Sequence, residues 1–490
     1  MKSSLKHIWV AIVAISLMSV SCTKDFGELN TNPNTSAAAA PQTLLGPTLL
    51  AVVNANLNRA MRINHDMMQV TVTTSESTQF HRYVVKPTES DFMWRYWYIQ
   101  LTNVRDIFTS AGLLKEADQK TYQAISYILD AWVSSMITDM YGDVPYFESN
   151  LGKDLNVQPK FDAQKDIYAD LFKKLDTANA WLTANVNLTD TSSAADPLYK
   201  GNANKWRRFG NSLYLRLLMR ASGKASSGAV AQIKKIIIDA PATYPIMTGN
   251  EYSAVLPIGS TNPLMSEFAN YRDLDFSGGR GYTEFFINNL NAWIDPRLPK
   301  IATALGLGGG YLGMTSGYSN GAAPEIMSTY LNSLKVDAHL GNIMNYAELQ
   351  FILAEAAARG YITGTPKTYY DAGVQNAITF WGAAVPAGYM DKDDVKWIDG
   401  ITPDEKIERI LLQKYYTLFF TDFQSWSEFR RTGHPVLPIG PGVQNNGKMP
   451  SRFVYPIQTI ATNPAHYQEA VSAMGGVDDI NVKVWWNQPD

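Results

Sequence analysis

The chain has 490 residues, of which 46% are apolar and 18% charged, and its formal net charge is −3. This composition is typical of a globular protein and excludes a disordered chain, a collagen and an acidic-tail protein. Nucleic acid is excluded as the main partner, because phosphate binding needs clustered Lys and Arg, whereas no run of five like charges occurs. No stretch beyond residue 21 is apolar for the ~18 residues that a membrane-spanning helix needs.

The N-terminus has the pattern of a lipoprotein signal peptide. Lys2 and Lys6 precede the apolar run Ile8–Val20, which is too short to span a bilayer comfortably. The small residue Ser21 then precedes Cys22, the single cysteine of the chain. A small residue before a cysteine is what a lipoprotein signal peptidase requires. We therefore expect residues 1–21 to be removed and the Cys22 thiol to carry diacylglycerol in the outer membrane, which anchors the protein without spanning the membrane.

The segment that follows is rich in Thr, Asn, Ala and Pro, which is typical of a flexible tether. We expect this lipid-anchored tether to cover residues 22–41. No charged or Ser-rich linker divides the remaining chain. Residues 42–490 are therefore predicted to form one α-rich domain.

Apolar side chains recur at i, i+3 and i+4 through much of this domain, and this spacing predicts amphipathic helices. The stripes lie within residues 125–140, 167–182, 206–217, 344–358, 374–381 and 407–418. Trp132, Trp206 and Trp381 fall on these stripes and are predicted to be core residues. Asp162 precedes the second stripe and is a candidate N-cap.

Two of the predicted helices form a hairpin. Gly360 and Gly364 end the fifth segment, and Pro366 can open the next. Ala347 and Phe351 have the A-x3-F spacing of tetratricopeptide (TPR) repeats, although no clean repeat period runs through the chain. The predicted fold is therefore mainly α, with TPR-like helical hairpins. Long irregular stretches, which are often functional in such a chain, are predicted at 141–161, 185–202, 241–283, 299–341 and 432–490.

The chain lacks the motifs of common enzyme classes. It contains no H-E-x-x-H and no G-x-x-x-x-G-K-[ST], and its six histidines do not have metal-ligand spacing. The segment GGGYLG at 308–313 has neither the preceding strand nor the following helix of a dinucleotide site, so it is predicted to be a surface loop. A surface glycoside hydrolase or an accessory peptidase remains the alternative, since Asp and Glu are abundant and a carboxylate pair leaves no motif.

One segment has the spacing of a calcium loop. Asp273, Asp275, Ser277 and Glu284 occupy positions 1, 3, 5 and 12 of an EF-hand pattern. Arg280, however, stands at position 8, where an apolar residue normally pairs two such loops. A polar turn before a helix at 282–293 is the preferred interpretation; calcium is the alternative, and no other cofactor is expected.

Aromatic side chains in polar or glycine-rich loops are the candidate ligand contacts. An exposed ring can stack on the C–H face of a sugar or on a peptide plane, while Arg and Asn bind hydroxyls or carbonyls. The loops 75–91, 266–281 and 305–320 are predicted to carry these contacts, the first of them ahead of the aromatic cluster 94–98. The predicted ligand-binding residues are Phe80, Arg82, Tyr83, Tyr271, Tyr311 and Tyr318.

An ordered series of segments runs along the chain: YGDVPYFES (141–149), KWRRFGNSLYLRLLMR (205–220), DPRLP (295–299), NYAELQFILAEAAARGYI (345–362), WSEFRRTGHP (426–435), SRFVYP (451–456) and VWWN (484–487). This series resembles the SusD/RagB family of outer-membrane nutrient-binding lipoproteins of Bacteroidetes, and most closely its SusD-like branch.

The resemblance implies a TPR-based helical fold that binds a nutrient without catalysis. It implies a cell-surface protein that captures glycans or oligopeptides. It also implies a lid-like partnership with a TonB-dependent outer-membrane barrel of the SusC/RagA type. The family does not fix the ligand, so the six loop residues are predicted from their chemistry alone.

Overall fold

The computed structural model describes residues 39–114, 116–306 and 308–490, and the predicted apolar stripes are helices in it. The mainly helical fold is thereby confirmed. Trp132, Trp206 and Trp381 are buried, as the stripes predicted. The helices that carry the six stripes are α6 (Glu116–Tyr141), α7 (Gln164–Trp181), α9 (Ala203–Ala221), α14 (Tyr346–Ala358), α15 (Pro366–Phe380) and α16 (Pro403–Thr417).

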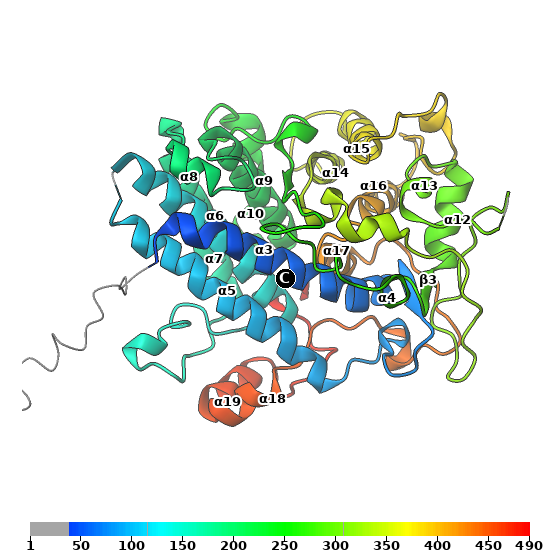
Figure 1. Cartoon of the computed structure of the whole chain (residues 1–490), viewed down its shortest axis with the longest axis horizontal. Helices are drawn as coiled ribbons and strands as arrows, with labels where there is room; N and C mark the ends of the chain where they lie inside the picture. The colour runs from blue at the N-terminus through cyan, green and yellow to red at the C-terminus, as the bar shows by residue number, and fades with distance from the viewer. Residues whose placement is uncertain (1–38, 115, 307) are drawn as a thin grey trace, which may run out of the picture. The chain divides into compact units, whose positions relative to one another are not determined.

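One group of helices packs through successive neighbours. Helix α3 (Pro41–Arg59) packs on α5 (Ser90–Ala111), α5 on α6, α6 on α7 and α7 on α9 (Figure 1). The contact faces are the apolar stripes, and Trp97, Trp132 and Trp206 are each almost completely buried in them. Burial of an amphipathic face, more than intrinsic helix propensity, stabilises helices of this kind.

A second group surrounds the predicted hairpin. Helix α14 ends at Ala358, Gly360 adopts a left-handed φ of +74°, and α15 begins at Pro366. Helix α16 packs on both. Its N-terminus has a capping box, in which the Thr402 side chain accepts from the Glu405 amide while the Glu405 carboxylate accepts from the Thr402 amide.

Short antiparallel strand pairs and shorter helices occupy the connections. Strand β1 (Thr71–Thr73) pairs with β3 (Arg280–Tyr282), and β2 (Ala254–Val255) pairs with β4 (Asn342–Met344). The remaining helices include α4 (His65–Met67), α8 (Asp190–Ala194), α10 (Ala229–Lys234), α11 (Asp273–Phe276), α12 (Glu284–Trp293), α13 (Leu298–Ile301), α17 (Gln424–Thr432), α18 (Ile457–Thr462) and α19 (Pro464–Ala473).

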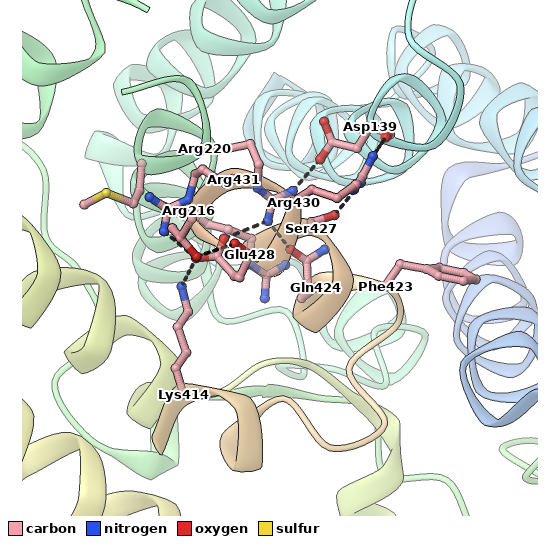
Figure 2. Close-up of polar contacts among 12 residues, drawn as sticks. Asp139, Arg216, Arg220, Lys414, Phe423, Gln424, Ser427, Glu428, Arg430 and Arg431 are labelled. Atoms are coloured by element: carbon pink, nitrogen blue, oxygen red, sulfur yellow. Dashed lines mark hydrogen bonds and ion pairs between the residues drawn. The ribbon is translucent and has the colours of Figure 1, made fainter. Parts of the chain in front are cut away.

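A buried network of charged side chains joins the two groups of helices. Arg220 of α9 contacts Asp139 of α6 on one side, and Gln424 and Glu428 of α17 on the other (Figure 2). The two basic residues at the end of α17 extend the network. Arg430 donates to the carbonyl of Asp139 at 2.6 Å, and Arg431 pairs with Glu428 at 2.6 Å.

Each charge in this network faces an opposite charge or a strong acceptor. Lys414 of α16 binds Glu428 at 3.0 Å, and Arg216 of α9 binds both oxygens of Glu348 of α14 at 2.6 and 2.7 Å. Removal of one partner would leave the other charge buried and uncompensated, which is costly. Six members of the network belong to the segments that carried the family resemblance, and their contacts indicate that these segments hold the helices together: Arg216, Arg220, Glu348, Glu428, Arg430 and Arg431.

Several local predictions were wrong. Asp162 does not cap α7: its carboxylate accepts from the amides of Tyr146 and Phe147, and Asp143 instead accepts from the amide of Gln164, the first residue of α7. Helices α18 and α19 lie in a stretch that was predicted to be irregular. The compact unit begins at Ala40, so Pro41 belongs to α3 and not to the tether.

The signal peptide, Cys22 and most of the tether lie outside the described residues, and those assignments stay predictions. Among the residues that the structure describes, no helix is both long and apolar enough to cross a bilayer.

Candidate functional site

Two adjoining hollows form the candidate binding site, with volumes of about 580 and 260 Å³. They lie between the N-terminal half of α5, the loop 145–159 and helix α18, and they share Trp94, Tyr98, Thr459 and Thr462 in their walls. We treat them as one site and call it the α5–α18 groove. Helices α18 and α19 lie at the lower edge of Figure 1, below the N-terminal half of α5.

Trp94 and Tyr98 form the aromatic floor of the groove. They lie one helical turn apart on α5, and their ring centroids are 5.0 Å apart. Trp94 also meets Tyr141 edge-on at 5.0 Å and Phe161 at 6.2 Å, so its ring is held in place from behind. Both floor residues are half-buried, which leaves part of each ring open to a ligand.

The Tyr98 hydroxyl fixes the opposite wall. It donates to the carbonyl of Pro145 at 2.6 Å, and burial raises the pKa of Tyr98 well above its usual value, so the hydroxyl stays protonated. Asn150 adds a second link, since its side-chain amide donates to the carbonyl of Tyr98 at 2.8 Å and to the hydroxyl of Thr102 at 2.6 Å. The loop 145–159 is therefore fixed on α5.

Neutral polar groups line the third side. The Gln458 and Thr459 side chains project from α18 and make no hydrogen bond with any residue that the structure describes. Asn463 is almost completely buried; its amide donates to the carbonyl of Pro159 at 2.7 Å, while its Oδ1 has no described partner. These groups can donate to and accept from the hydroxyls of a neutral ligand.

The groove is close to electrically neutral. Among its described lining residues, Asp91 and Arg95 alone are charged, and both are exposed. Hydrolysis of a glycosidic bond normally needs two carboxyl groups that flank the bond, and only one lies in this wall. The arrangement suits binding by aromatic stacking and hydrogen bonding.

The structure brings together four of the six predicted ligand residues, away from the groove. Phe80, Arg82 and Tyr83 belong to one short helical turn and its C-cap, which packs on Tyr318. The Arg82 Nε donates to the carbonyl of Tyr318 at 2.8 Å, and the guanidinium lies 4.8 Å from the ring centroid. All four residues are at most 3% exposed.

A glycine-rich loop from far along the chain contacts the backbone at Arg82 and Tyr318. The amide of Gly442 donates to the carbonyl of Gly317 at 2.6 Å, and a side chain at Gly442 would collide with the carbonyl of Tyr318. The glycines here permit close backbone approach, so the loops cover each other. Ligand contact by the four residues stays a prediction, and it requires the loops 75–91 and 305–320 to open.

Tyr271 and Tyr311 are half-buried, and neither lines the groove. The Tyr271 hydroxyl donates to Glu267 at 3.0 Å and accepts from Asn58 at 3.0 Å. The carbonyl of Tyr311 accepts from the Asn291 side chain at 2.8 Å. Their part in ligand binding also stays a prediction.

The calcium-loop alternative does not fit the structure. Asp273 and Asp275 lie in helix α11, where Lys335 binds Asp273 at 2.6 Å and Arg272 binds both oxygens of Asp275. Ser277 donates to the carbonyl of Asp273, and Glu284 begins α12. Among the described residues, no group of three or more His, Cys, Asp or Glu could hold a metal ion.

The sequence signal for the groove was the aromatic cluster 94–98 itself. Its residues alternate between buried and open positions on α5: Trp97 is 1% exposed, whereas Trp94 and Tyr98 reach the surface. The polar residues of α18 gave no signal, because a six-residue helix has too few positions to show a period.

The family of SusD-like proteins, described as starch-binding and associating with the outer membrane, matches residues 33–456. The chain belongs to this family of nutrient-binding outer-membrane proteins, whose members bind without catalysis. No match was found among curated proteins.

Solved structures have the same fold over nearly the whole chain. A chitin-binding protein is 27% identical, with a TM-score of 0.77 over 91% of this chain and 99% of its own. A Bacteroides vulgatus outer-membrane protein, described as involved in nutrient binding, is 26% identical with a TM-score of 0.77 over 92% and 100%. A chitin-binding SusD homologue from Flavobacterium johnsoniae, 22% identical, has a TM-score of 0.76 over 92% and 99%.

Proposed function

We propose that this protein is a surface lipoprotein that captures a neutral glycan in the α5–α18 groove and delivers it to a TonB-dependent outer-membrane transporter. The observation that carries the proposal is the pairing of open aromatic rings with unpaired neutral polar groups. Trp94 and Tyr98 supply the rings, and Gln458 and Thr459 supply the polar groups. A sugar has C–H faces that stack on the rings and hydroxyls that form hydrogen bonds with the polar groups.

The absence of clustered charge in the groove walls supports a neutral ligand. The similarity to a chitin-binding protein at 27% identity and the starch-binding description of the family support a glycan. An oligopeptide is the other ligand class expected for the family, and it would use the same rings to stack on peptide planes.

Attachment to the membrane is proposed through Cys22. The proposal rests on the apolar run Ile8–Val20 and on the small residue that precedes the cysteine. Mass spectrometry of the protein purified from outer membranes should find an N-terminus at Cys22 that carries diacylglycerol. An unmodified Cys22, or a different start, would contradict this assignment.

The transporter partner is proposed to be a barrel of the SusC/RagA type, which this protein would cover as a lid. The support is membership of the SusD-like family. Mild detergent extraction at native expression levels should recover a large β-barrel together with this chain. Elution of the chain alone would count against the partnership.

A panel of neutral glycans and oligopeptides tests the ligand class. Starch and chitin oligosaccharides should bind the purified protein in calorimetric titrations, and chromatography should find no new products afterwards. Binding of peptides alone would replace the glycan by the oligopeptide. Turnover that is lost on mutation of a single Asp or Glu would contradict capture without catalysis.

A further inference from the structure

A second cavity, of about 670 Å³, lies on another part of the molecule. Its walls are α9, the segment 236–248 and the first halves of α14 and α15, and we call it the α14–α15 cavity. It shares no lining residue with the α5–α18 groove. Its volume is within the usual range for small-molecule sites.

The outer wall of the cavity is fixed by hydrogen bonds to its backbone. Arg207 donates to the carbonyl of Thr243 at 2.8 Å, Arg208 to that of Ile246 at 2.6 Å, and Asn211 to that of Pro245 at 2.8 Å. The segment 236–248 therefore has a defined shape before any ligand arrives. Binding then costs less conformational entropy than it would with a flexible segment.

The lining is aliphatic and nearly uncharged. Ile236, Ile246 and Leu353 form much of it, and Arg208 is its one charged residue among those described. The Arg208 guanidinium already donates to the carbonyl of Ile246 at 2.6 Å and to the side-chain oxygen of Asn204 at 2.9 Å. Such walls suit aliphatic side chains, and they hold no carboxylate that could pair with a cationic ligand.

One polar side chain in this wall lacks a partner. Gln350 of α14 is 6% exposed, and its amide makes no hydrogen bond with any residue that the structure describes. The hydroxyls of Tyr346 and Tyr369, also in the wall, have no described partner either. The two polar atoms of this amide are open to the cavity, so a ligand there could supply the partners that the protein does not.

We propose that the α14–α15 cavity binds an uncharged stretch of an oligopeptide that carries aliphatic side chains. The Gln350 amide has one donor side and one acceptor side, which match the C=O and N–H of a peptide group. A sugar fits less well, because its many hydroxyls would face Ile and Leu. The molecule would then have separate sites for a glycan and for a peptide.

Methyl NMR spectroscopy of the whole chain tests this proposal. The probe is a capped, uncharged pentapeptide of alternating alanine and leucine, and the observed signals are the methyl groups of Ile236, Ile246 and Met247. We expect saturable shifts of these signals. The variant Gln350→Leu should weaken binding about tenfold, because a peptide group is left unpaired.

A second variant and a control keep the test decisive. Thr368 is exposed at the rim, so Thr368→Trp should leave the fold intact while blocking entry. Gln468 is exposed on α19 and lines neither site, so Gln468→Leu should leave peptide affinity unchanged. The proposal is overturned if the peptide causes no shifts, if neither cavity variant weakens them, or if a chitin oligosaccharide competes for the same methyl groups.

Discussion

The hydroxyl of Tyr98 donates a hydrogen bond of 2.6 Å to the carbonyl of Pro145, 47 residues further along the chain. This bond joins the floor of the α5–α18 groove to its wall. The ring that is placed to stack on a ligand therefore also sets the width of the site.

Substitution of Tyr98 by Phe should separate these two roles. The ring remains, but the Pro145 carbonyl loses its donor, so we expect a stability loss of about 1 kcal/mol and a severalfold weaker affinity for glycan. Tyr370→Phe is the matched control, since the buried Tyr370 hydroxyl donates to the carbonyl of Val395 at 2.6 Å, away from the groove. Denaturant titration and calorimetry should show similar stability losses and an affinity loss in Tyr98→Phe alone. If Tyr98→Phe bound glycan as tightly as Tyr370→Phe does, the Tyr98 hydroxyl would not position the groove wall.

The buried charge network predicts a large stability effect at Glu428. This carboxylate pairs with Arg220 at 3.2 Å, Lys414 at 3.0 Å and Arg431 at 2.6 Å, and these cations hold its pKa well below the usual value against the opposing effect of burial. Glu428→Ala should lower the free energy of unfolding by ~3–5 kcal/mol, because uncompensated cations remain buried.

Glu469→Ala is the control for that measurement. Glu469 is exposed and pairs only with His466 among the described residues, so its removal should leave the midpoint of urea unfolding unchanged. If Glu428→Ala and Glu469→Ala changed the free energy of unfolding by the same small amount, the charge network would not stabilise the packing of the helices.

The six loop residues predicted from the sequence are tested by a comparison of stability and affinity. Tyr83 and Tyr318 are each 3% exposed, so replacement by Ala should cost about 3 kcal/mol of stability and lower the melting temperature. Tyr311→Ala, at a half-buried position, should cost less. Lost affinity in a variant that remains folded would support the predicted contacts. Unchanged affinity with a sharply lowered melting temperature would refute them.

His434 predicts a pH-dependent contribution to stability. Its Nδ1 lies 2.5 Å from Glu408 and its Nε2 lies 3.1 Å from Asp404. The hydrogen bond with Glu408, aided by Asp404, raises the His434 pKa above its usual value despite partial burial. The stabilisation is therefore complete below pH ~6.5, the unfolded-state pKa, and it is lost as the pH rises through the raised folded-state pKa.

The variant His434→Gln should accordingly be less stable than the natural protein at pH 5.5, with a difference that narrows toward pH 9. Thermal unfolding across this range measures the difference. A gap that stays constant, or widens with pH, would argue against a charged His434 between the two carboxylates.

The sequence predicted six helices from their apolar stripes. It missed α5, although Met93, Trp97, Leu101 and Val104 form a stripe there, and it missed helices that lack a stripe. Helix α3 follows an Ala-rich segment, contains Pro47 and has apolar residues around much of its circumference, so no stripe stood out. Helix α18 is six residues long, and α19 is ten. Their positions depend on long-range bonds such as that between the Asn463 side chain and the Pro159 carbonyl.

The candidate site was harder to predict than the fold, because three segments far apart in the sequence build it. Glycine also misled the interpretation of the loops. Glycines near Tyr311 and Tyr318 suggested open, flexible segments, whereas Gly317 and Gly442 bring two backbones close enough to bury Tyr318. Composition alone does not distinguish these two uses of glycine.

Titration of a neutral glycan into two tryptophan variants tests the central claim most directly. Trp94 forms the groove floor, whereas Trp181 is equally half-buried but stacks on Tyr127 at 5.2 Å on another surface. With a starch or chitin oligosaccharide that binds the natural protein, Trp94→Ala should lose about 30-fold in affinity, as expected for an aromatic anchor, while Trp181→Ala should bind normally. Normal binding by a folded Trp94→Ala variant would contradict a glycan site in the α5–α18 groove.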